Sequence, residues 1–326
     1  MGRYVIRRIL LLFVVMFGVI AFVYAFQGIS DSDPVAIILG NNATEEQIAA
    51  KRLELGLDDP IIVQFLNYCW QLISKGSLGT SWMTQKPIVS ELMVYFPYTL
   101  RLAFGSVALG VIIGIPLGVI SAVKQYSIID NIILAASVFL SSVPNFWLSL
   151  MLILLFAVNL GWLPAAGIST WKGWVLPMTV VAIQTAASVI RNTRSSMLET
   201  IRQDYVRTAR AKGQSEFKII ISHALRNSLI PIVNAIGVSL STQLGGALII
   251  ENIFSIPGLG QYAVSAINNR NYPAVLGSTI LLSFTFSIVN FLMDMIYILI
   301  DPRLKSSFAV VKKKRKPKAA AEAAAQ

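Results

Sequence analysis

The most informative stretch of the chain reads Tyr205-Val-Arg-Thr-Ala-Arg-Ala-Lys-Gly213, followed by Ser215-Glu-Phe-Lys-Ile-Ile-Ile-Ser-His-Ala-Leu-Arg-Asn227. A helix-length pattern stops at a small-residue turn and restarts as a second amphipathic helix. Ala209, Ala211 and Gly213 expose almost no side chain, so the backbone of another protein could approach closely here. Such a shape indicates a docking knob for a soluble partner.

The hydrophobic residues on both sides of that turn have helical spacing. In the first piece one face is shared by Leu198, Ile201, Tyr205 and Val206. In the second piece the i, i+3, i+4, i+7, i+8 template is followed by Phe217, Ile220, Ile221, Ala224 and Leu225. Both pieces lie among basic residues, so we expect them on the cytoplasmic side of a membrane.

Composition assigns the chain to the membrane proteins. It is 55% hydrophobic and 13% charged, and its mean hydropathy of +0.68 is too high for a soluble globular protein. Runs of about 20 apolar residues can cross the hydrocarbon core as helices. Six such spans are predicted, near Ile9–Phe26, Thr99–Val123, Ile132–Val158, Val175–Ile190, Leu229–Ile250 and Ala274–Ile300. We expect Pro116 and Pro144 to kink their spans without ending them.

The lysines and arginines assign an orientation. Most of the 27 fall in the N-terminal stub, the Lys124 loop, the loop 191–228 and the C-terminal tail. Cytoplasmic segments carry the Lys and Arg excess, so both termini are predicted to be cytoplasmic. The excess of Lys and Arg in the cytoplasmic segments then accounts for the net charge of +11, and nucleic-acid binding is not needed to explain it. Only Asp294 and Arg101 lie clearly inside the spans, and we expect structural roles for both.

The first span has an alternative interpretation. Arg3, Arg7 and Arg8 precede an apolar stretch that ends near Ala25, which is also the pattern of a cleaved signal peptide. The long apolar core favours a retained helix, because its removal would leave an odd number of spans.

Four regions follow from these patterns. Residues 1–26 form a stub and the first helix, residues 27–98 an extracytoplasmic region, residues 99–302 a five-helix core containing the loop 191–228, and residues 303–326 a basic tail expected to be disordered. The extracytoplasmic region is interpreted either as a platform for a solute-binding protein or as a loop that packs over the bundle.

Small residues predict where helices meet. Gly110, Gly114 and Gly118 recur every four residues, so they share one face where another backbone can approach. Gly245 and Gly246 do the same in the fifth span and add flexibility. These positions are interpreted as packing contacts that could also slide or hinge as a pathway opens.

An irregular segment, Glu251-Asn-Ile-Phe-Ser-Ile-Pro257-Gly-Leu-Gly260, leaves the fifth span on the outer side. From the residues alone it could be a cap without solute contact.

Catalytic machinery is not recognisable in the sequence. His223 is the only histidine and Cys69 the only cysteine, so neither a two-histidine metal site nor a paired nucleophile and base can form. The Gly-x4-Gly-Lys-Ser/Thr phosphate loop is also missing. We therefore predict that the chain is not an enzyme and holds no cofactor or metal.

The opening stretch resembles the coupling motif by which permease subunits of ABC transporters engage their ATPases. The resemblance is closest to the dipeptide/oligopeptide group, and there to the first-permease (B-type) subunit, through Asp204-Tyr-Val-Arg-Thr-Ala-Arg-Ala-Lys-Gly213 and His223-Ala-Leu-Arg-Asn-Ser-Leu-Ile-Pro231. The broader consensus has Glu-Ala-Ala where this chain has Arg207-Thr208-Ala209, and its proline lies nearer the glycine. Both departures look like those of the peptide subgroup. The implied ATPase-coupling residues are Asp204, Tyr205, Arg207, Thr208, Ala209, Ala211, Lys212 and Gly213. In the resembled family the segment after the fifth span lies close to the external gate and the binding protein, which implies a gate at Glu251, Pro257, Gly258 and Gly260.

The resemblance implies an all-α membrane protein with the six-helix fold of type I ABC importer permeases, in a bacterial or archaeal cytoplasmic (inner) membrane. Its implied partners are a second homologous permease, two subunits that bind ATP and Mg, an extracytoplasmic peptide-binding protein and the lipid bilayer. The expected solutes are dipeptides or oligopeptides, with nickel chelates or opines as the alternative. A self-sufficient carrier or channel remains the competing class, although such a protein would not require the knob. Carriers also favour repeated halves or central charges, and the sequence shows neither.

Overall fold

The computed structural model describes residues 2–29, 34–40 and 43–300, and the predicted tail lies outside them. Within these residues the regular elements are helices, apart from one antiparallel bridge between Thr80 and Pro87. Four helices are long and apolar enough to cross a membrane, and there are six spans if each of two bent helix pairs counts as one. The four are α1 (Gly2–Ile29), α5 (Ile88–Val123), α8 (Val175–Ile201) and α14 (Tyr272–Ile300).

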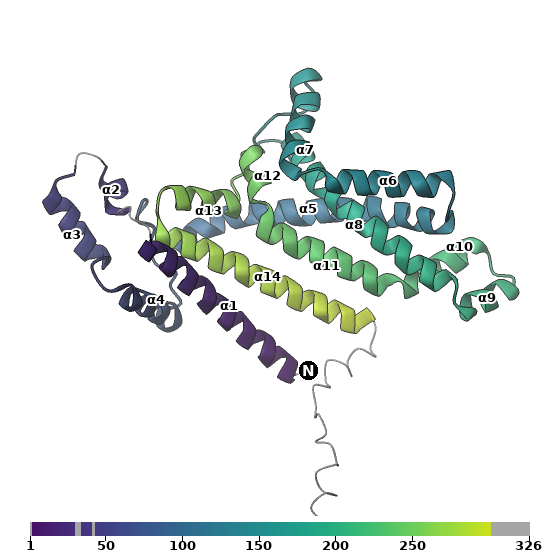
Figure 1. Cartoon of the computed structure of the whole chain (residues 1–326), viewed down its shortest axis with the longest axis horizontal. Coiled ribbons are helices and arrows are strands. Elements are labelled where there is room, and N and C mark those ends of the chain that lie inside the picture. Colours follow the sequence, from purple (N-terminus) through teal and green to yellow (C-terminus); the bar gives the residue numbers. More distant parts are fainter. Residues whose placement is uncertain (1, 30–33, 41–42, 301–326) are drawn as a thin grey trace, which may run out of the picture.

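The remaining helices are shorter and form the bent pairs and the two ends of the bundle. Near one end lie α2 (Pro34–Leu39), α3 (Glu45–Leu55), α4 (Ile61–Lys75) and α13 (Leu259–Asn268). The middle and the opposite end contain α6 (Ile128–Ser142), α7 (Asn145–Leu152), α9 (Asp204–Ala211), α10 (Glu216–Lys218), α11 (Leu229–Gly246) and α12 (Leu248–Ile253). Two π-helical segments, Ile153–Asn159 and Ile219–Leu225, continue α7 and α10, and a 3-10 turn, Trp171–Trp174, precedes α8. Figure 1 shows α3 and α4 at one end of the long axis and α9 and α10 at the other.

The third predicted span is broken, which corrects the expectation for Pro144. α6 ends at Ser142, and α7 begins at Asn145 after an extended Val143 and Pro144. A proline disfavours the helical conformation of the residue before it and has no N–H to continue the ladder, so the chain turns by 101° here. Pro116, in contrast, lies inside a continuous α5. In Figure 1 α7 points away from the bundle.

Several predicted boundaries move because polar residues continue the helices. α5 begins at Ile88, so the proposed division between residues 98 and 99 falls inside a helix. α8 continues to Ile201, beyond the predicted end at Ile190, and therefore includes the first part of the 191–228 loop. The region 27–98 is largely helical, and α3 starts at a capping box in which Thr44 and Gln47 bond each other's backbone.

α5 and α8 form the tightest helix pair, and their contact is set by glycine. A Cβ atom added at Gly110, Gly114 or Gly118 would lie 2.7, 2.8 or 2.6 Å from a side-chain carbon of Thr185, Val189 or Thr193, respectively. The backbones of α5 and α8 can approach this closely only because these positions lack a side chain. The predicted glycine face is therefore the α8-facing side of α5.

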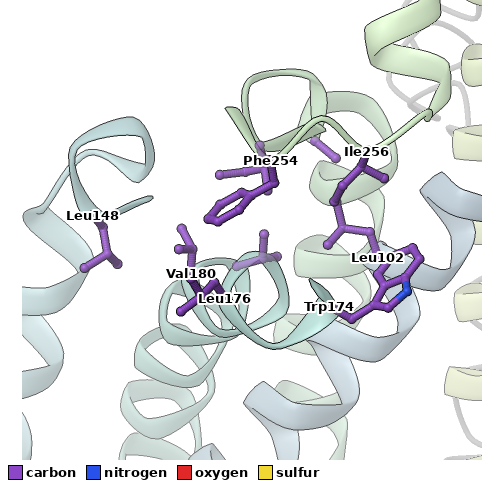
Figure 2. Close-up of a cluster of buried hydrophobic side chains, with 10 residues drawn as sticks. Leu102, Leu148, Trp174, Leu176, Val180, Phe254 and Ile256 are labelled. Atoms are coloured by element: carbon purple, nitrogen blue, oxygen red, sulfur yellow. The ribbon is translucent and has the colours of Figure 1, made fainter. Parts of the chain in front are cut away.

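The N-terminal half of α8 is held by a hydrophobic cluster. Its buried members come from α5, α7, the 3-10 turn before α8, α8 itself, the junction of α11 and α12, α12 and the turn after α12. Figure 2 shows Phe254 and Ile256 from that turn reaching toward Leu176 and Leu102. Burying a side chain such as Phe or Ile contributes about 1.5 to 3 kcal/mol. The cluster thus fixes the turn after α12 on the ends of two membrane helices. In contrast, α1 packs at the edge of the bundle, where only Ile20 is buried among its described side chains.

Candidate functional site

The 191–228 loop is anchored to the membrane helices by an apolar base. Buried Ala122, Met197 and Ala224 connect the last turn of α5 to α8 and to the π-helical segment Ile219–Leu225. Partly buried Ile201 and Ile220 surround them. Buried hydroxyl groups add hydrogen bonds to this apolar base. Ser228 donates to Thr200 at 2.9 Å, and Ser196 donates to the Ser228 carbonyl at 3.2 Å. Motion of the loop is therefore tied to the ends of α5 and α8.

The knob itself consists of α9, the Gly213 turn, α10 and the π-helical segment. Gly213 has a φ of +75°, a left-handed conformation that glycine adopts without a steric penalty. Arg210 bridges the turn, because its Nε lies 2.7 Å from Glu216 Oε1. A hydrogen bond to Glu216 raises the pKa of Arg210 above its usual value. His223 Nε2 and Gln214 Oε1, 2.7 Å apart, close the other side of the turn.

Ala209 faces the inside of the knob, which corrects its predicted role as a contact for another protein. Val206 and Ala209 lie three residues apart on α9 and pack on Ile219, and all three are buried. Ile219 was not singled out from the sequence, because its spacing fits neither predicted face. The knob therefore has a small core of its own.

The outer surface of the knob is apolar as well as charged. Phe217 is 77% exposed, and Tyr205 and Ile221 are 44% and 41% exposed. No atom of the described chain lies within 4 Å of a Cβ added at Gly213. The other predicted coupling residues on this surface are Asp204, Arg207, Thr208, Ala211 and Lys212, all exposed. The structure thus brings the predicted set together on one exposed knob, with Ala209 excepted.

A buried ion pair at the base of the loop was missed from the sequence. Asp130 at the start of α6 is 1% exposed, and Arg194 of α8 is 18% exposed. Arg194 donates to Asp130 through Nε and Nη2, both at 2.8 Å. The hydroxyl of Ser121 and the backbone N–H of Tyr126 also donate to this carboxylate. One side chain therefore joins α5, the α5–α6 turn, α6 and α8.

The predicted gate residues form a second site at the other end. The carboxylate of Glu251 is fully buried, accepts from Thr99 Oγ1 at 2.7 Å and accepts from the Gln261 N–H at 3.0 Å. Thr99 Oγ1 accepts in turn from the Leu259 N–H at 2.8 Å. A Cβ added at Gly258 would overlap the Glu251 carboxyl, and one added at Gly260 would lie 2.8 Å from its Oε2. Glu251 thus ties α5 to the turn that enters α13, in which Pro257 precedes Gly258.

Gly245 does not share this tight packing. It is exposed, and no atom of the described chain lies within 4 Å of an added Cβ. Gly246 is the last residue of α11.

A paired substitution tests the contact between Glu251 and the turn that enters α13. Gly258 has an extended backbone that alanine also adopts, so Gly258→Ala adds only a clash with the Glu251 carboxyl. We expect a loss of about 1 to 3 kcal/mol, the usual cost of overpacking, measured as a lower thermal midpoint in detergent. Gly245→Ala, which meets open space, is the matched control and should not lower the midpoint. Equal midpoints for both variants would contradict the Glu251 contact.

The sequence and the fold match known transport proteins. The description "binding-protein-dependent transport system inner membrane component" matches residues 114–306, and its N-terminal counterpart matches residues 1–103. The chain belongs to this family, and it is a permease subunit of an ABC importer and an integral membrane protein.

Relatives support the same class over 94% of the chain, and a solved structure supports the fold. A putative peptide transport system permease protein of Brucella abortus is 35% identical over 313 residues, covering 94% of this chain and 99% of that protein. A glutathione transport system permease protein of Pectobacterium atrosepticum is 36% identical over 305 residues with the same coverage. The inward-facing methionine ABC transporter MetNI has a similar fold, with a TM-score of 0.55 and 24% identity over 65% of this chain and 97% of that one.

Proposed function

We propose that this permease subunit forms half of a peptide-import pathway and is driven by separate ATPases that dock on the knob. The observation that carries the proposal is the exposure of Phe217 and Tyr205 on a knob with a core of its own. Aromatic side chains exposed on a rigid support are typical anchors of protein interfaces. The partner subunits would supply ATP and Mg, and hydrolysis would take place on them.

The two ends of the bundle support an orientation for the importer. Figure 1 shows the start of α1 and the end of α14 directed away from α3 and α4, toward the end that carries α9 and α10. Together with the Lys and Arg excess, this favours cytoplasmic termini and a cytoplasmic knob. The α2–α4 region would then face an extracytoplasmic binding protein, and the chain would lie in a bacterial or archaeal cytoplasmic membrane.

The proposed number of partner subunits follows from the number of membrane spans needed to enclose a large solute. A single chain with six spans at most encloses a large solute poorly, so we propose a complex of this subunit with a second, homologous permease and two ATPases. This chain would be the first-permease, or B-type, subunit. Peptides are the proposed solutes because relatives with about 35% identity are named for peptide and glutathione transport.

The identity of the transported solute can be tested by identifying the ligand that the extracytoplasmic binding protein retains. The binding protein that docks on this complex would be purified without added solute, and its ligand extracted and identified by mass spectrometry. We expect a mixture of short peptides. A nickel complex, an opine or a sugar, with no peptide present, would contradict the peptide assignment and leave the importer class intact.

A further inference from the structure

A cavity of about 530 Å³ lies beside α13 and the turn that enters it, and the proposed function assigns no role to this cavity. Its walls come from the first turns of α5, the turn at residues 81–84 and α13, which packs against α5. In Figure 1 α13 lies next to the end of α5 that is farthest from the knob. The lining residues that matter here are Thr84, Glu91, Tyr95, Asn252, Gln261 and Tyr262.

Glu91 is held in a fixed orientation with acceptor capacity left over. Tyr262 OH donates to Glu91 Oε2 at 2.6 Å, and Thr84 Oγ1 donates to Oε1. Burial, followed by the bond to Glu91, raises the pKa of Tyr262, so its hydroxyl remains a proton donor. A carboxylate accepts about four hydrogen bonds, so roughly two positions remain for a ligand. Among the described residues that line the cavity, none is a lysine or an arginine.

Two aromatic rings stand beside this carboxylate. The rings of Tyr95 and Tyr262 are tilted by 34°, with centroids 4.8 Å apart. An aromatic face attracts a cation, and a neighbouring carboxylate adds charge-assisted hydrogen bonds. Asn252 and Gln261 also line the cavity, and the Asn252 amide donates to the Leu248 carbonyl. A carboxylate beside aromatic faces is a combination that suits an organic ammonium group.

The cavity is rigid and connected to the candidate gate. Asn271 is buried, donates to Ser81 Oγ at 2.8 Å and accepts from the Trp82 N–H at 3.1 Å, which fixes the turn at residues 81–84. In α13, the Gln261 N–H donates to Glu251. A ligand in the cavity would therefore contact the same segment that Glu251 ties to α5.

We propose that this cavity binds the α-ammonium group of the incoming peptide, with Glu91 as the counter-ion and Tyr95 and Tyr262 as its aromatic walls. The inference rests on the proposed function for the identity of the solute, and it adds a recognition site on the permease itself. Free peptides share an α-ammonium group whatever their side chains, so the site selects the class of solute without selecting a sequence.

The test uses the complete transporter in lipid nanodiscs without the binding protein. Binding of Ala-Ala and of N-acetyl-Ala-Ala would be measured by saturation-transfer NMR. We expect the wild-type complex to bind Ala-Ala at least about 10-fold more tightly than the acetylated peptide, because acetylation removes the charge. Glu91→Gln should weaken Ala-Ala binding to a similar degree, and Tyr95→Leu should weaken it several-fold. Size-exclusion chromatography would establish that each variant complex is intact.

Glu54→Gln provides the matched control, since Glu54 is an exposed carboxylate of α3 outside this cavity. It should bind Ala-Ala like the wild type. Equal binding of the two peptides, or Ala-Ala binding that is unchanged in both Glu91→Gln and Tyr95→Leu, would overturn the proposal. A non-peptide ligand in the binding protein would overturn the proposed function instead, so the two failures are separate.

Discussion

Phe217→Ser is expected to weaken binding of the ATPase subunits at least about 30-fold while leaving the stability of the isolated permease unchanged. Phe217 is 77% exposed, so the isolated chain loses little packing when the ring is removed. A central aromatic anchor of a protein interface contributes about 2 kcal/mol or more, and 2 kcal/mol corresponds to about 30-fold in affinity. The affinity would be measured by surface plasmon resonance with the permease complex immobilised in nanodiscs.

Trp70→Ser is the matched control for this experiment. Trp70 is 70% exposed on α4, near the end of the bundle opposite the knob. Its replacement removes a similar exposed ring and should leave ATPase binding unchanged. ATPase affinity that is equal in the Phe217 variant and the wild type would contradict docking on the knob.

Arg194→Leu is expected to destabilise the permease by about 3 to 5 kcal/mol, because it leaves the carboxylate of Asp130 buried without its cation. Asp130→Leu should also be strongly destabilising, since it leaves Arg194 mostly buried without its carboxylate. Replacing both residues by leucine removes both charges, so most of the loss should be recovered. The expected signature is strong non-additivity between the two positions.

Denaturation in detergent micelles, followed by tryptophan fluorescence, would measure all four proteins of this cycle. Arg202, which is exposed and bonds Gln125 at 3.4 Å, supplies a control cation at the same end of α8. Arg202→Leu should change stability by less than about 1 kcal/mol, as is usual for exposed charges. Additive losses at Asp130 and Arg194 would show that the pair does not act as a unit.

The sequence predicts the knob well because its signals are local. Gly213 marks the turn, and hydrophobic spacing marks the helices on both sides. It does not predict which faces pack, since α9 and the π-helical segment pack on each other through Ala209 and Ile219. The single-residue offset of the π-helix Ile219–Leu225 also changes which residues share a face. Ile219 and Ala224 are therefore buried, whereas Phe217 and Ile221 are exposed.

Contacts between distant segments explain the remaining differences. Asp130 and Arg194 are separated by 64 positions and lie just beyond the predicted ends of their spans, so neither was recognised as an intramembrane charge. Pro144 was read as a kink, although a proline with an extended residue before it can equally separate two helices. The Glu251 contacts join α5 to the turn before α13, a pairing that hydrophobic periodicity does not encode.

Uptake into proteoliposomes tests the central claim most directly, because it asks whether this chain transports alone or only when coupled to ATPases. Labelled peptide uptake would be compared for this chain alone, for the two permeases together, and for the complete complex with its binding protein outside and ATP inside. The account predicts uptake by the complete complex only, dependent on ATP and lost in Phe217→Ser. Peptide uptake by this chain alone, without ATPase subunits, would contradict it.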